Sequence, residues 1–160
     1  MDALFQMQSN ELSTTTQKDK LFKDAERQWN SLSSEKGVSG RKVDCEIYKS
    51  ILYNLEIRKV YLDSKLSLEK FSSIVGTNTT YLSNAVNNYF GCNFKQLINS
   101  YRVAYARELL DGGGYPVRDL FSHCGFASKS VFYVAFGKVV GMTPLQYLSR
   151  SRNPLIIQHN

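Results

Sequence analysis

The chain has 160 residues, enough for one domain of ordinary size or two very small ones, and 42% of them are hydrophobic, so most of it can bury a core. Its formal net charge of +6 favours a polyanionic partner, and residues 43–160 carry most of the excess, with thirteen basic and eight acidic side chains. It has neither an 18-residue apolar run nor a signal peptide, so we expect no membrane association and a cytoplasmic location.

The cysteines and histidines argue against a metal site or an enzyme. Three cysteines, Cys45, Cys92 and Cys124, are odd in number and widely separated, and only two histidines accompany them. His123 and Cys124 could suggest a base and a nucleophile, but adjacent helical residues point about 100° apart. Paired carboxylates, metal-ligand clusters and phosphate-binding loops are also missing from the sequence. We therefore expect no enzyme activity and no cofactor.

The N-terminal part is expected to be a flexible segment, residues 1–42, that contains one short amphipathic helix. Residues 1–17 are polar and lack periodicity, which predicts disorder. Apolar residues recur at helical spacing over 19–32, and residues 33–42 are typical of a flexible linker. The helix has no obvious cover for its large apolar side chains, Leu21, Phe22 and Trp29. Three roles remain open: pairing with its own copy, binding a partner protein, or fraying in solution.

The next part predicts four helices separated by capping residues and glycines. An amphipathic helix is expected over 44–62. Ser67 is a good N-cap for a short helix over 68–75. Asn78 can cap a helix that ends at Gly91, and a long amphipathic helix follows over 94–110. The glycines of 111–114 end that helix.

The same order of elements then begins again. A short helix near 117–121 is expected to stop at Gly125, and the following helix stops at Gly141. Thr143 caps a last short helix that has Pro144 at its first position.

The two halves form an internal repeat. Leu68, Phe71 and Gly76 match Val117, Leu120 and Gly125 at an offset of 49 residues. After one inserted residue, seven further positions match at an offset of 50, from Leu82 with Phe132 to Ile98 with Leu148. A duplicated helix–turn–helix unit accounts for both the apolar positions and the repeated glycines.

The stretch from about Leu66 to Leu148 resembles the C-terminal DNA-binding domain of AraC/XylS-type transcription regulators. The matching segments are "LSLEKFSSIVGTNTTYLSNAV", "FKQLINSYRVAYARELL" and "VRDLFSHCGFASKSVFYVAFGKVVGMTPLQYL". The most specific marks are Gly125–Phe126, the Phe132/Phe136 pair and "GMTPLQY". Arg102 matches the family's linker-helix arginine, which we interpret as structural.

The resemblance implies an all-α fold with two helix–turn–helix subdomains, at about 66–92 and 116–141, joined by the linker helix over 94–110. The DNA-binding domain would span 43–152, and 153–160 would form a tail. The resemblance further implies a bacterial, sequence-specific regulator that inserts two recognition helices into successive major grooves of double-stranded DNA at the nucleoid.

The DNA-contacting residues are expected by position on the outward faces of these helices. Base readers in the first unit would be Thr80, Ser83, Asn84 and Asn87, and in the second Lys129, Ser130, Tyr133 and Val134. Phosphate contacts are expected from Thr79, Ser128, Lys129 and Lys138.

Asn84 and Val134 stand where the family often has arginine, which favours either an A·T-leaning readout or a weaker specific affinity. Two roles stay open for the second unit: Val134 touches a thymine methyl group, or the unit contributes mostly contacts to the DNA backbone. About 45 residues precede the domain, too few for a sensor module, so we expect regulation through expression level or a partner such as RNA polymerase or another regulator. The oligomeric state is left open. The alternative function is a protein-interaction module on a decayed helix–turn–helix fold.

Overall fold

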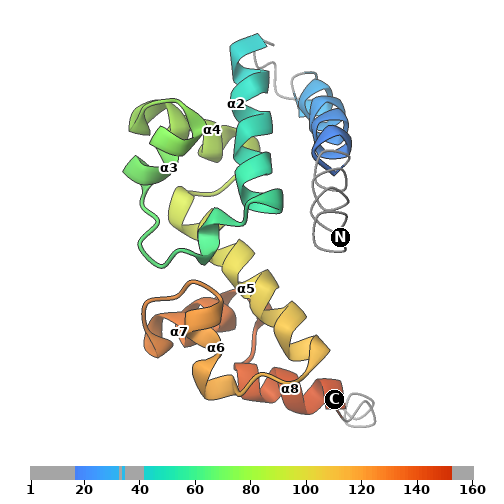
Figure 1. Cartoon of the computed structure of the whole chain (residues 1–160), viewed down its shortest axis with the longest axis vertical. Helices are drawn as coiled ribbons and strands as arrows, with labels where there is room; N and C mark the ends of the chain where they lie inside the picture. The colour runs from blue at the N-terminus through green and yellow to red at the C-terminus, as the bar shows by residue number, and fades with distance from the viewer. Residues whose placement is uncertain (1–16, 33, 35–41, 153–160) are drawn as a thin grey trace, which may run out of the picture. The chain divides into compact units, whose positions relative to one another are not determined.

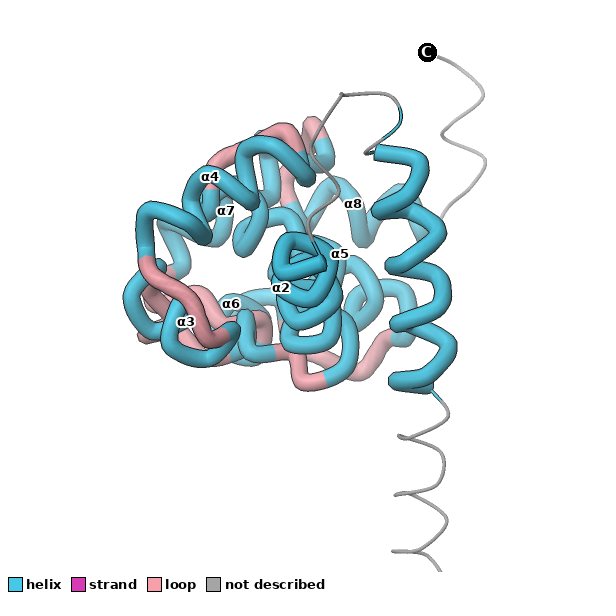
Figure 2. The backbone as a smooth tube through the Cα atoms, turned by 90° about the horizontal axis from the view of Figure 1, so that it is seen from above, coloured by secondary structure: helices cyan, strands magenta, loops and turns pink. Residues whose placement is uncertain are grey.

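The computed structural model describes residues 17–32, 34 and 42–152, and these form helices and loops, with no strand among them (Figures 1 and 2). The all-α prediction is confirmed. The expectations for residues 1–16, for most of the linker and for the tail lie outside the described residues. No helix in the described ranges is long and apolar enough to cross a membrane. The chain divides into two compact units: unit 1 is Met1–Val60 with Ser67–Cys92, and unit 2 is Tyr61–Leu66 with Asn93–Asn160.

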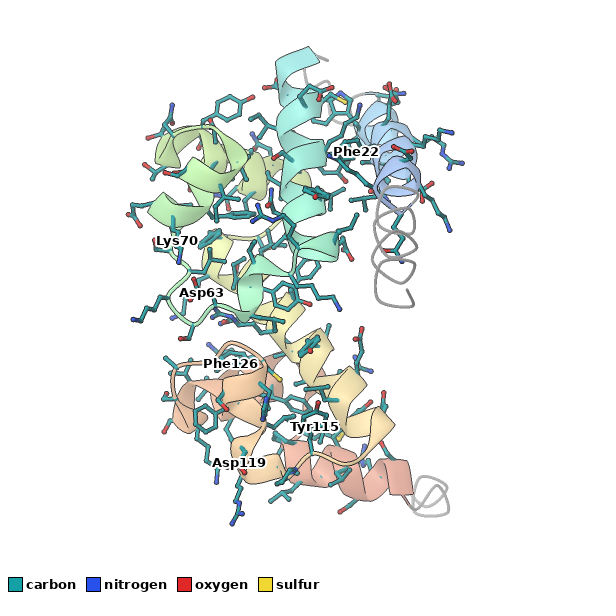
Figure 3. All side chains as sticks on the ribbon, in the orientation of Figure 1. Phe22, Asp63, Lys70, Tyr115, Asp119 and Phe126 are labelled. Atoms are coloured by element: carbon teal, nitrogen blue, oxygen red, sulfur yellow. The ribbon has the colours of Figure 1, made fainter. Side chains whose placement is uncertain are left out.

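The helix over 17–32 packs within unit 1 against α2 (Lys42–Leu52). Ala25 and Trp29 are buried, and the Trp29 ring lies 5.9 Å from that of Tyr48 and 4.8 Å from that of Tyr89. Phe22 points toward α2 (Figure 3). The prediction that this helix has no cover is therefore wrong. Its cover comes from aromatic side chains of later helices, and helical periodicity does not reveal such a partner.

The helix expected over 44–62 is interrupted. After α2 the chain forms a π-helical turn, η1 (Tyr53–Ile57), and then a 3-10 turn, η2 (Val60–Leu62). Between them Lys59 has a φ of +50°, in the left-handed region. Asn54 is buried, donating to the Ser50 carbonyl at 2.8 Å and accepting from Arg58 at 3.1 Å. These local side-chain bonds compete with the regular helical ladder, so a single straight helix over 44–62 was the wrong expectation.

The first helix–turn–helix forms as predicted. It consists of α3 (Leu68–Val75) and α4 (Thr79–Phe90). The side chains of Ser67 and Asn78 accept hydrogen bonds from the backbone N–H groups of Lys70 and Tyr81, which fixes the two helix starts. The helices bury an apolar face that includes Phe71, Leu82 and Val86.

Unit 2 contains the long helix and the second helix–turn–helix. Its elements are α5 (Phe94–Gly112), η3 (Val117–Asp119), α6 (Leu120–His123), α7 (Lys129–Val140) and α8 (Pro144–Arg152). α7 lies beside α5 (Figure 1). Between these helices the core is formed by Val103, Ala106, Leu110, Leu120, Cys124, Phe126, Phe132, Ala135 and Phe136.

The repeat extends to individual hydrogen bonds. Asn93 and Gln96 form a reciprocal capping box at the start of α5, and Thr143 and Gln146 form the same box at the start of α8. Fifty residues separate these pairs. The same distance separates the caps of α4 and α7. Because both halves use the same local devices, each half specifies its own helix starts.

Gly125 is more tightly constrained than Gly76, its counterpart in the first half. Gly76 and Gly125 both have left-handed φ angles, +87° and +86°. A Cβ atom at Gly76 would meet nothing within 4 Å, whereas one at Gly125 would lie 2.3 Å from the Tyr61 carbonyl oxygen. Gly125 is therefore required both by its backbone angle and by the close approach of the backbone of Tyr61 and Leu62.

We predict that Gly125→Ala destabilises the protein clearly more than Gly76→Ala. Both changes place a side chain at a left-handed φ, at a cost of about 1–2 kcal/mol. Only Gly125→Ala also forces a clash with backbone, which adds about 1–3 kcal/mol. Urea unfolding of the two variants measures the difference. Equal losses would mean that the backbone of Tyr61 and Leu62 does not pack tightly on Gly125.

Candidate nucleic-acid interface

The outward stripe of α4 is polar and uncharged. Thr80, Asn84 and Asn87 are exposed and stand at spacings of four and three residues, so they share one face of the helix. Thr79 and Ser83 are half-buried beside that face, and one amide hydrogen of Asn87 is donated to the Ser83 carbonyl at 2.9 Å. The five residues predicted on this helix therefore lie together, and three of them are open to a ligand.

The outward face of α7 combines lysines with apolar groups. Lys129, Ser130, Val134 and Lys138 are exposed, and Val134 keeps 58% of its surface accessible. Tyr133 is half-buried, because its ring packs against Phe132 at 5.8 Å, and Lys129 lies 5.6 Å from the Tyr133 ring. Ser130, Val134 and Lys138 lie beside one another, whereas Lys129 and Tyr133 lie on the neighbouring side of the helix.

The exposed surface of α7 also includes residues that were not predicted from the sequence. Val131, which is 48% exposed, lies one turn before Val134. Lys95 and Asn99 of α5 join it around a hollow of about 250 Å³ between α5 and α7. The three-residue spacing of the valines was a usable signal for Val131. No local sequence pattern reveals that residues of α5 line the hollow beside α7.

Ser128 caps the start of α7, whether or not it also contacts a ligand. Its hydroxyl oxygen accepts a hydrogen bond from the Val131 N–H at 3.3 Å and so caps α7. The phosphate contact expected of Ser128 remains a prediction. The exposed N–H groups of a helix start suit an anion, and a serine cap leaves its own hydroxyl hydrogen available.

Carboxylates are absent from both helix faces within the described structure. α4 contains no charged residue, and the charged residues of α7 are Lys129 and Lys138. Such surfaces do not repel phosphate groups.

His123 and Cys124 do not form a catalytic pair. Burial raises the pKa of the Cys124 thiol to about 12, and the exposed His123 ring lies 5.3 Å from the Tyr115 ring. Cys124 is accordingly a packed, protonated thiol.

Comparisons with known proteins agree with this geometry. A family model described as a helix-turn-helix domain matches residues 71–150. The melibiose operon regulatory protein of Escherichia coli strain K12 is 32% identical over 90 residues, covering 56% of this chain and 30% of that protein. The chain thus spans less than a third of that relative's length.

Two solved structures show the same fold. The C-terminal domain of AraT, a response regulator from Geobacillus stearothermophilus, has a TM-score of 0.58 at 27% identity, covering 65% of this chain and 84% of that one. The DNA-binding domain of the global transcriptional factor AdpA, solved with a target DNA, has a TM-score of 0.59 at 20% identity, covering 68% and 96%. The chain belongs to the AraC-type helix–turn–helix family.

Three substitutions at Ser128 separate its capping role from its proximity to phosphate. Asn and Asp cap helices about equally well, so Ser128→Asn and Ser128→Asp should both retain the stability of the protein. Ser128→Ala should lower it by about 1 kcal/mol. If the start of α7 lies beside a DNA phosphate, Ser128→Asp should bind DNA at least roughly tenfold more weakly than the isosteric Ser128→Asn. Equal DNA affinities would place the start of α7 away from the phosphates.

Proposed function

We propose that the chain is a sequence-specific DNA-binding transcription regulator whose recognition helices are α4 and α7, each placed in one of two neighbouring major grooves. The observation that carries this proposal is the pair of equivalent, side-chain-capped helices, each with an exposed face that carries no carboxylate. The major groove is about wide enough for one α-helix, and bound half-sites recur about 34 Å apart along the duplex.

The first unit would read bases by hydrogen bonds. Asn84 offers the donor and acceptor pair that fits adenine, and Thr80 offers a hydroxyl and a methyl group. Ser83 and Asn87 flank them on the same helix. In the second unit, Ser130, Tyr133 and Val134 would face base edges. The phosphate contacts would come from Thr79, Ser128, Lys129 and Lys138, because lysines and helix starts bind phosphate without reading sequence.

The proposed regulator acts on chromosomal DNA in the bacterial cytoplasm by binding alone, without a catalytic step or a cofactor. RNA polymerase or another regulator would be the protein partner that converts binding into a change in transcription. The alternative of a protein-interaction module is less well supported, since the matched relatives are transcription regulators.

Selection of bound duplexes from a random DNA pool tests the proposal, followed by affinity measurements across a salt series. We expect enrichment of a defined site, with log K falling in log salt by about 0.9 per neutralised phosphate. No enrichment, together with an affinity that hardly depends on salt, would contradict the proposal and favour the interaction module.

Replacing Asn84 by alanine tests base reading by α4 directly. Asn84→Ala should weaken binding to the selected site by roughly 1–3 kcal/mol and leave binding to random DNA nearly unchanged. Competition binding assays measure both affinities. Asn30→Ala, an equally small change at an exposed residue of the helix over 17–32, is the control and should alter neither. Equal losses of Asn84→Ala on both kinds of DNA would show that Asn84 does not read a base.

A further inference from the structure

Two exposed valines stand together on the face of α7. Val131 and Val134 keep 48% and 58% of their surfaces accessible, and with Ala135 they form the apolar part of the hollow between α5 and α7. Valine neither donates nor accepts a hydrogen bond, and its branched side chain is stiff. A ligand at this position must therefore offer an apolar group of small size.

The rim of the hollow favours a ligand that also carries negative charge. Lys95 of α5 and Lys138 of α7 line it, with Asn99 and Ser130 as its neutral polar groups. Among the lining residues there is no carboxylate. A ligand that combines small apolar groups with flanking negative charge matches this surface. In the major groove of DNA, the C5-methyl group of thymine is such a group, and phosphates border it on both sides.

The spacing of the valines agrees with the spacing of bases. Residues three apart on a helix are separated by about 4.5 Å along its axis. Consecutive nucleotides of one strand rise about 3.4 Å. Two valines one turn apart can therefore meet methyl groups on two neighbouring base pairs.

We propose that Val131 and Val134 recognise the methyl groups of thymines in the part of the DNA site bound by α7, while Lys95 and Lys138 hold the adjoining phosphates. The proposal rests on the DNA-binding function proposed above. In α4 the residues fifty positions earlier are the half-buried Tyr81 and the exposed Asn84. The two units would consequently read DNA by different chemistry: hydrogen bonds in unit 1 and apolar contact in unit 2.

Replacing thymine by deoxyuridine tests this directly, because only the methyl group is removed. The full chain is titrated onto a selected duplex in which each thymine in turn is replaced. One or two positions in one half of the site should each lose about fourfold in affinity, as expected for a methyl group returned to water. In Val134→Ala at least one of these losses should shrink to less than twofold. Val139→Ala is the matched control, since Val139 lies on the same helix, is 49% exposed and does not line the hollow.

The possible failures are distinguishable. Absence of any selected site would overturn the proposed function, and the methyl-reading inference with it. A selected site that binds equally well with every thymine replaced would overturn methyl reading alone. So would deoxyuridine losses that persist unchanged in both Val131→Ala and Val134→Ala. If those two variants leave DNA binding unaltered, the inference is wrong.

Discussion

Within unit 2, the carbonyl oxygen of Tyr61 is contacted both by α5 and by the turn that precedes α7. Arg102 of α5 donates its Nε–H to this oxygen at 2.7 Å and an Nη2 hydrogen to the Asp63 carbonyl at 3.0 Å. Gly125 approaches the same oxygen so closely that no side chain fits there. The Arg102 guanidinium also lies 5.6 Å from the Phe126 ring. Burial lowers the Arg102 pKa from its usual value, but an arginine stays charged at neutral pH. The charged Arg102 guanidinium and the absence of a side chain at Gly125 together allow residues 61–63 to pack against the turn that precedes α7.

These contacts of Arg102 and Gly125 explain how the short helix α7 can present a fixed surface. The turn at Gly125 lies just before Ser128, the cap of α7, and the buried Phe132 and Phe136 hold the helix from within. α7 is thus fixed by its cap, its core face and a segment more than sixty residues earlier in the sequence. Side chains that select among DNA sequences need such rigid support, because small displacements break short hydrogen bonds and apolar contacts.

Duplication fixed the framework of the two halves and left their surfaces free to differ. Both halves keep the capping boxes, the left-handed glycines and the buried faces of their second helices. The outward residues are not repeated, because Asn84 corresponds to Val134 and Thr79 to Lys129. The first unit has an uncharged polar face, and the second has an apolar face between lysines. If both faces contact DNA as proposed, the bound site would be asymmetric and the protein would bind it in one orientation.

Local chemistry explains which features the sequence was able to predict. Caps such as Ser67 and Asn78 act within three residues, and glycines end helices by their own backbone freedom, so these boundaries were predictable. The π-helical turn contains the buried Asn54, whose hydrogen bonds to Ser50 and Arg58 are local but leave no mark in the apolar periodicity. The cover of Trp29 comes from Tyr48 and Tyr89, which lie in later parts of the chain. Helical spacing likewise predicted that Ser130, Val134 and Lys138 are neighbours on α7, whereas the position of Lys95 beside them depends on the packing of α5 against α7.

Hydroxyl-radical footprinting of the full chain on a selected duplex shows whether both α4 and α7 engage DNA, as proposed. We expect two protected blocks on one face of the duplex, with centres about 10 base pairs apart, one for each recognition helix. A single protected block would contradict the proposal, since only one of the two units would then be bound to DNA.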